Sequence, residues 1–91
     1  MIDVAGIQQL RHRLYRKRRG AKYRPRVDEI IALGDGRFKV YLFNLPLEQT
    51  PLHKILEPDY RVTQFGRDTR CGYIVAERVD DGDSDAVGRD V

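Results

Sequence analysis

Residues 27–45, VDEIIALGDGRFKVYLFNL, have the pattern of a β-hairpin, in which two apolar strands are joined by a tight turn. The turn is the GDG of Gly34–Gly36, because these residues tolerate the positive φ angles that a tight turn requires. On the first strand we expect Val27, Ile31 and Leu33 to share one side. The stretch therefore predicts antiparallel strand pairing.

The second strand of this hairpin is apolar on both of its sides. One side carries Phe38, Val40 and Leu42. The other carries Tyr41 and Phe43 next to Lys39. A strand with two apolar sides is typical of a central position covered on both faces. The same two-sided character of residues 38–45 favours a homodimer.

The chain after this hairpin predicts a short helix and a second hairpin. The segment PLEQTPLHKILEP has Thr50 as an N-cap and Pro51 at the first helical position. The second hairpin has strands near 59–65 and 71–79, joined by the loop GRDTR at 66–70.

The chain before the first hairpin predicts a basic helix over residues 1–19, with Asp3 as its N-cap and Gly20 as its C-terminal stop. One face of this helix is apolar and consists of Val4, Ile7, Leu10 and Leu14. Residues 20–26 read as an extended basic connector, because Gly20 and Pro25 both oppose helix.

These elements give the order α-β-β-α-β-β and the α+β class. We expect a four-stranded, mainly antiparallel sheet with one or both helices packed on a face. The 91 residues suit a single domain, which we place at 1–79. The remaining residues, 80–91, read as a disordered acidic tail.

Charge is distributed unevenly along the chain. The stretch RHRLYRKRRGAKYRPR, residues 11–26, holds nine of the seventeen Lys and Arg residues. Residues 1–26 carry a net charge of +8, whereas residues 27–91 carry −5. No acid lies between Asp3 and Asp28, although a helix that is merely soluble usually intersperses both signs. The pattern predicts a polyanionic partner.

We interpret this partner as nucleic acid, either DNA or RNA. The helix would grip phosphates through Arg11, Arg13, Arg16, Lys17, Arg18 and Arg19. The connector would extend the grip through Lys22, Arg24 and Arg26. Tyr15 and Tyr23 lie among these cations and would stack on bases or pack. Arg67 and Arg70 could add a secondary contact from the 66–70 loop, although an ordinary turn with Asp68 pairing locally is favoured there.

Two other interpretations fit the same residues. A protein–protein module or inhibitor would dock its basic helix on an acidic protein surface. A small toxin-type ribonuclease would use His12, which lies among the arginines, as a general acid or base. The two histidines, His12 and His53, show no diagnostic acid–base spacing, so we expect a protein that is not an enzyme.

The sequence predicts no metal site and no cofactor. A single cysteine, Cys71, and two distant histidines match no zinc spacing, and there is no glycine-rich phosphate loop. No apolar run approaches the roughly 18 residues that span a bilayer, and the N-terminus is not a signal peptide. We therefore expect a soluble cytoplasmic protein without a membrane partner.

Overall fold

The computed structural model describes residues 3–79. Its elements, in chain order, are α1 (Val4–Tyr15), β1 (Val27–Gly34), β2 (Arg37–Leu42), α2 (Thr50–Leu56), β3 (Tyr60–Arg67) and β4 (Gly72–Arg78). This order confirms the predicted α+β fold with two hairpins. The predicted acidic tail, residues 80–91, lies outside the described residues.

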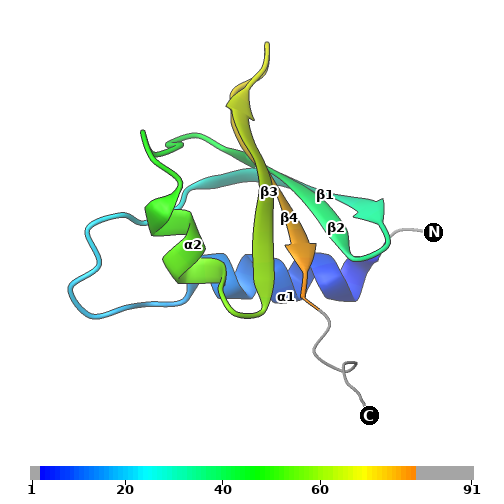
Figure 1. The fold of residues 1–91 in the computed structure, drawn as a ribbon, viewed down its shortest axis with the longest axis horizontal. Coiled ribbons are helices and arrows are strands. Elements are labelled where there is room, and N and C mark those ends of the chain that lie inside the picture. Colours follow the sequence, from blue (N-terminus) through cyan, green and yellow to red (C-terminus); the bar gives the residue numbers. More distant parts are fainter. Residues whose placement is uncertain (1–2, 80–91) are drawn as a thin grey trace.

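The four strands form one antiparallel sheet in the order β1-β2-β4-β3, so β2 and β4 are central. Figure 1 shows α1 crossing the lower ends of the strands, with α2 beside its C-terminal end. Asp3 caps α1 by accepting a 2.8 Å hydrogen bond from the Gly6 N–H, as predicted. The β1–β2 turn has positive φ at Gly34, Asp35 and Gly36, which also matches the prediction.

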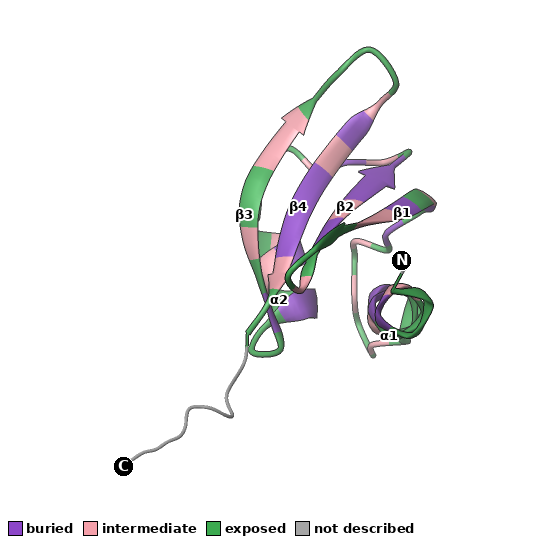
Figure 2. Cartoon of the chain, turned by 90° about the vertical axis from the view of Figure 1, so that its right-hand side faces the viewer, coloured by how far each residue is buried: buried purple, intermediate pink, exposed green. Residues whose placement is uncertain are grey.

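The core lies between one face of the sheet and both helices. Its fully buried side chains come from every layer: Leu10, Leu14, Phe38, Val40, Leu42, Leu52, Leu56 and Ile74. Figure 2 shows the buried residues concentrated on the central strands and on the sides of the helices that face them. Removing apolar area of this kind from water is the main favourable term in folding a small domain.

The prediction that Val27, Ile31 and Leu33 share one side of β1 was wrong. Val27 belongs to the core together with Ile30, whereas Leu33 is 42% exposed. The register shifts between Val27 and Glu29, so an extra residue, Asp28, bulges out of the ladder. A bulge reverses the side to which every later residue of the strand points. The alternation of apolar and polar residues in the sequence does not show where such a bulge lies.

The expected cover on both faces of β2 was also wrong. The face that carries Tyr41 and Phe43 is not covered by a helix or a second sheet within residues 3–79, and Phe43 is 67% exposed. Tyr41 is nevertheless buried, because Arg70 and Lys39 lie over its ring at 4.3 and 4.8 Å. We call this surface the open face.

The basic helix is shorter than predicted. It ends at Tyr15, and Arg16 has an extended backbone with ψ of 129°. Gly20 therefore does not stop the helix; it adopts φ of 74° within a loop. A continued helix would bring Arg18 near the apolar stripe, whereas in the loop its guanidinium reaches backbone carbonyls.

No helix within the described residues has the length and apolar character needed to span a membrane.

Candidate nucleic-acid interface

Residues 16–26 form a loop between α1 and β1, which we call the basic loop. Figure 1 shows it swinging out beyond α2 before it returns to the sheet. Its cations are Arg16, Lys17, Arg18, Arg19, Lys22, Arg24 and Arg26. The predicted segment is therefore one projecting loop that follows a short helix, rather than a long helix with a short connector.

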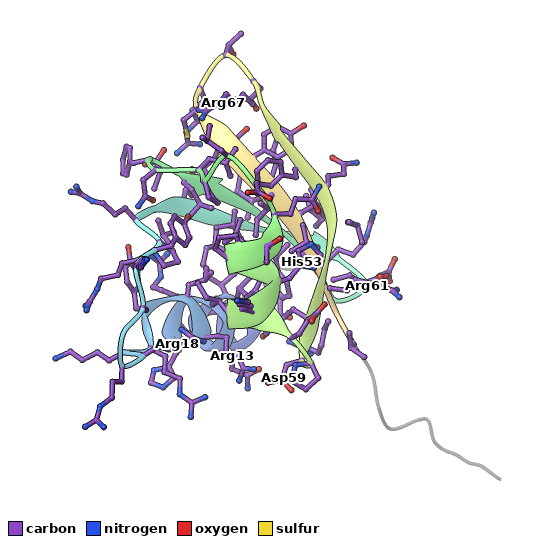
Figure 3. The ribbon with its side chains drawn as sticks, turned by 60° about the vertical axis from the view of Figure 1, so that its left-hand side comes forward. Arg13, Arg18, His53, Asp59, Arg61 and Arg67 are labelled. Atoms are coloured by element: carbon purple, nitrogen blue, oxygen red, sulfur yellow. The ribbon has the colours of Figure 1, made fainter. Side chains whose placement is uncertain are left out.

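Arg13 does not face outward with the other cations. Its guanidinium donates to the carbonyl oxygens of Ile55 at 2.9 Å and Glu57 at 3.0 Å, and it pairs with Asp59 at 2.8 Å. Figure 3 shows Arg13 and Asp59 together beside α2. Cations at a helix C-terminus satisfy the free carbonyls there and suit the helix dipole. Arg13 thus braces α2 against α1.

Arg18 adds to this brace from the start of the basic loop. It donates to the Ile55 carbonyl oxygen and to that of Arg16, both at 3.0 Å. Burial, with the nearby charges of Arg13 and Arg16, lowers the pKa of Arg18 from its ordinary value. An Arg side chain still stays charged at neutral pH. Two of the nine expected phosphate ligands therefore have structural partners.

The remaining cations of the basic loop are exposed: Arg16, Lys17, Arg19, Lys22, Arg24 and Arg26. Their side chains form no ion pair or hydrogen bond within residues 3–79, and the same holds for exposed Arg11 on α1. Six acids of that range pair with Lys or Arg outside the basic loop: Arg13–Asp59, Lys39–Asp68, Arg61–Glu77, Arg70–Asp28, Arg70–Glu29 and Arg78–Asp3. Glu48 forms no ion pair with any described residue, although it borders a groove beside the loop. Within residues 3–79, none of these loop cations is therefore neutralised by an ion pair.

Two grooves flank the basic loop. One, of about 400 Å³, lies between the loop and the end of α1 and is lined by Tyr15, Lys17 and Arg26 among others. The second, of about 670 Å³, lies between the loop and α2 and is lined in part by Arg19 and Lys22. Cations border both grooves, so a chain of phosphates could approach the loop from either side.

The C-terminal part of the basic loop is fixed by Asn44. The Asn44 side-chain amide donates to the Arg24 carbonyl oxygen at 2.8 Å and accepts from the Arg26 N–H at 2.8 Å. The Phe43 N–H also donates to the Arg26 carbonyl oxygen, at 2.9 Å. These bonds hold residues 24–26 extended beside β2 and leave the Arg24 and Arg26 side chains exposed.

Tyr15, at the end of α1, and Tyr23, in the basic loop, have different environments. Tyr15 is 51% exposed, and its hydroxyl accepts a 2.9 Å hydrogen bond from the Val27 N–H, which fixes the ring. Tyr23 packs against the core, and its buried hydroxyl finds no partner within residues 3–79. Burial raises the pKa of Tyr23 to about 12. Of these two rings, only Tyr15 has the exposure that base stacking requires.

The 66–70 loop holds Arg67 and Arg70 in different ways. Arg70 pairs with Asp28 at 2.8 Å and Glu29 at 2.7 Å, so its charge is already compensated. Arg67 is exposed, and Figure 3 shows it at the far end of the molecule from Arg13 and Arg18. Arg67 is therefore not brought to the basic loop.

Asp68 accepts a 2.9 Å hydrogen bond from the nearby Arg70 N–H, as in an ordinary turn, but its side-chain partners lie on β2 rather than in the turn. The Tyr41 hydroxyl donates to Asp68 Oδ2 at 2.8 Å, and Lys39 Nζ lies 3.4 Å from the same atom. The Tyr41 hydrogen bond, followed by those from the Arg70 and Cys71 N–H groups, lowers the pKa of Asp68 to about 2. This network fixes the 66–70 loop over the open face.

The histidines are not brought together in one acid–base pair. His53 contacts Gln49 and Glu57, the residues that flank α2 at its two ends, at 3.0 and 3.4 Å. His12 is exposed on α1 and borders a separate groove with Arg13 and Asp59. Within the described residues, no group of three His, Cys, Asp or Glu side chains could hold a metal ion.

Two residues of this region were missed in the sequence. Asn44, which clamps the basic loop, and Phe43, which lies beside Arg26, both come directly after β2. Phe43 had been assigned to a covered strand face. Comparison of the chain with protein families, curated proteins and solved structures found no match.

Proposed function

We propose that this protein is a non-catalytic nucleic-acid-binding protein whose basic loop contacts phosphates. The observation that carries the proposal is the separation of charge in the fold. Asp28, Glu29 and Asp59 pair with cations outside the basic loop, and Glu48, which borders the groove with Arg19 and Lys22, forms no ion pair, so the six exposed loop cations have no acidic partner in residues 3–79. A concentration of unpaired cations on one projecting loop is the electrostatic footprint of a polyanion site.

The proposal divides the predicted phosphate ligands by their contacts. Arg13 and Arg18 brace α2, and Tyr23 packs in the core, so these side chains shape the loop rather than contact the ligand. Phosphate contacts are assigned to Arg11 on α1 and to the six exposed loop cations, Arg16, Lys17, Arg19, Lys22, Arg24 and Arg26. Arg forks can grip two phosphate oxygens at once.

Salt dependence measures how many of these contacts form. If about five of the seven cations meet phosphates, log K should fall with log salt at a slope of about −4.5 on duplex DNA and about −3.5 on a single strand. A docking interaction with an acidic protein surface is also electrostatic, so the slope must be measured with nucleic acid itself.

The test compares two variants that remove the same charge. Arg19→Ala with Lys22→Ala removes two loop cations, and Arg37→Ala with Arg67→Ala removes two exposed cations away from the loop. Affinity for labelled duplex DNA, single-stranded DNA and structured RNA is measured by fluorescence anisotropy across a salt series.

The loop variant should bind more weakly and lose about 1.5 to 2 from the magnitude of the salt slope, since each phosphate contact contributes about 0.7 to 0.9. The control variant should keep nearly the wild-type slope. Equal effects of the two variants would mean that net charge, not the loop, attracts the ligand. Absence of binding to all three nucleic acids at near-physiological salt would overturn the proposal in favour of an acidic protein partner.

A further inference from the structure

The end of the β1–β2 ladder places an exposed aromatic ring beside the basic loop. Val27 pairs with Leu42 and both side chains are buried in the core. The next residues outward are Arg26 and Phe43, which are joined by the 2.9 Å bond from the Phe43 N–H to the Arg26 carbonyl oxygen. Successive side chains of an extended chain point to opposite faces, so Phe43, which follows the core residue Leu42, is directed to the open face. Arg26 is exposed, lies across from Phe43 and borders the groove between the basic loop and α1.

Phe43 differs from the other rings of the open face in having its surface free. Tyr41 and Tyr73 form an edge-to-face pair with centroids 6.2 Å apart. Lys39 lies over both rings, at 4.8 and 4.5 Å from their centroids, and Arg70 covers Tyr41. Phe43 is 67% exposed, and no cation lies over its ring within the described residues. It can therefore accept a planar group from outside.

The backbone around Phe43 is already fixed. Asn44 bonds the backbone of both Arg24 and Arg26, and the Phe43 N–H bonds the Arg26 carbonyl, so the backbones of Phe43, Arg24 and Arg26 are held in one register. A ligand that contacts both would lose little free energy to ordering this segment. The acids on the same face, Asp28, Glu29 and Asp68, are compensated by Arg70 and Lys39.

We propose that Phe43 stacks on an unpaired base while Arg24 and Arg26 hold the adjoining phosphates, so that the ligand is a single-stranded nucleic acid. This inference rests on the proposed function and specifies its ligand class. In a duplex each base is covered by its neighbours, whereas an unpaired base offers its face to an aromatic side chain. A free ring beside cations that have no acidic partner is complementary to a base that is joined to its phosphate.

The test replaces Phe43 and measures single strands and duplexes separately. Phe43→Ala should lower the affinity for a single-stranded oligonucleotide roughly 5- to 150-fold, leave the salt slope unchanged and leave duplex binding unchanged. Leu33→Ala removes another exposed apolar side chain of the sheet and serves as the matched control, with wild-type affinity expected. Circular dichroism verifies that both variants fold.

A second variant reports the stacking directly. The chain has no Trp, so Phe43→Trp introduces a single indole. Its fluorescence should be quenched by a single-stranded oligonucleotide and not by a duplex, with affinity equal to or above that of the wild type.

The outcomes separate this inference from the proposed function. The stacking role would be overturned if Phe43→Ala bound single strands with wild-type affinity, or if the indole of Phe43→Trp were not quenched. Either result could occur together with a flattened salt slope in the Arg19 and Lys22 variant, which would still support phosphate contact by the loop. A wild-type protein that bound duplex DNA more tightly than single strands would also overturn the stacking role. Failure of the wild type to bind any nucleic acid would overturn the proposed function, and this inference with it.

Discussion

Replacing Arg13 with Ala separates a structural role from a binding role within the basic segment. The Arg13 side chain is only 20% exposed and donates to the carbonyl oxygens of Ile55 and Glu57. A hydrogen bond with a charged partner contributes about 1.5–3 kcal/mol to stability. The partly exposed pair with Asp59 adds about 0–1 kcal/mol.

These contributions do not simply add. Arg18 also donates to the Ile55 carbonyl oxygen, so in Arg13→Ala that oxygen keeps one partner and only the Glu57 carbonyl loses its donor. We therefore expect a loss of about 2–3 kcal/mol in the free energy of unfolding rather than twice that amount. For a domain of this size, such a loss lowers Tm by roughly 10–20 °C.

Urea unfolding followed by circular dichroism measures the effect, with Arg16→Ala as the matched control. The Arg16 side chain is exposed and has no partner in the described residues, so its replacement should change stability by less than about 0.5 kcal/mol. Arg13→Lys should recover part of the loss, because Lys donates but lacks the planar fork. A stability of Arg13→Ala within 0.5 kcal/mol of the wild type would refute the brace.

Two further predictions concern hydroxyl groups. Tyr41→Phe should raise the pKa of Asp68 from about 2 toward its ordinary 3.8, measured by NMR titration of the carboxyl carbon; an unchanged midpoint would contradict the assignment. Since the folded pKa is depressed, the wild-type carboxylate adds stability above pH 4 that is lost as pH falls toward 2. Tyr23→Phe should raise the free energy of unfolding by about 1 kcal/mol, because the hydroxyl is buried without a partner in residues 3–79, and a measured loss would reveal a missing hydrogen bond. The raised pKa of Tyr23 means that stability present below pH 10 is lost as pH rises toward 12, and this loss should diminish in Tyr23→Phe.

The elements of the fold could be predicted because their signals are local. The GDG turn needs positive φ at adjacent residues, and the alternation of Phe38, Val40 and Leu42 has the period of a strand. The faces of β1 could not be predicted, since the bulge at Asp28 depends on how β1 pairs with β2. A second register shift, between Val62 and Gln64 on β3, has the same origin.

The cationic segment could be located from the sequence, but the role of each cation could not. In the sequence, nothing distinguishes Arg13 and Arg18 from the neighbouring arginines. They are distinguished by their shared acceptor, the Ile55 carbonyl oxygen on α2, which lies 42 residues from Arg13 and 37 from Arg18. Phe43 was misassigned for a related reason. Its alternation with Tyr41 is the same whether a layer covers that face or not, so only the packing of both helices on the opposite face shows that its ring is free.

The anchor of the basic loop is uncharged, and this bears on what the loop can bind. Arg26 and Arg24 are held at their backbone by the amide of Asn44, which acts as donor and acceptor at once. A carboxylate at this position would supply no donor for the Arg24 carbonyl, and it would place a negative charge among the connector cations. With a neutral clamp, the loop is ordered at its C-terminal end and its cations still repel one another. That repulsion would fall if phosphates approached, so the arrangement agrees with the polyanionic ligand proposed above.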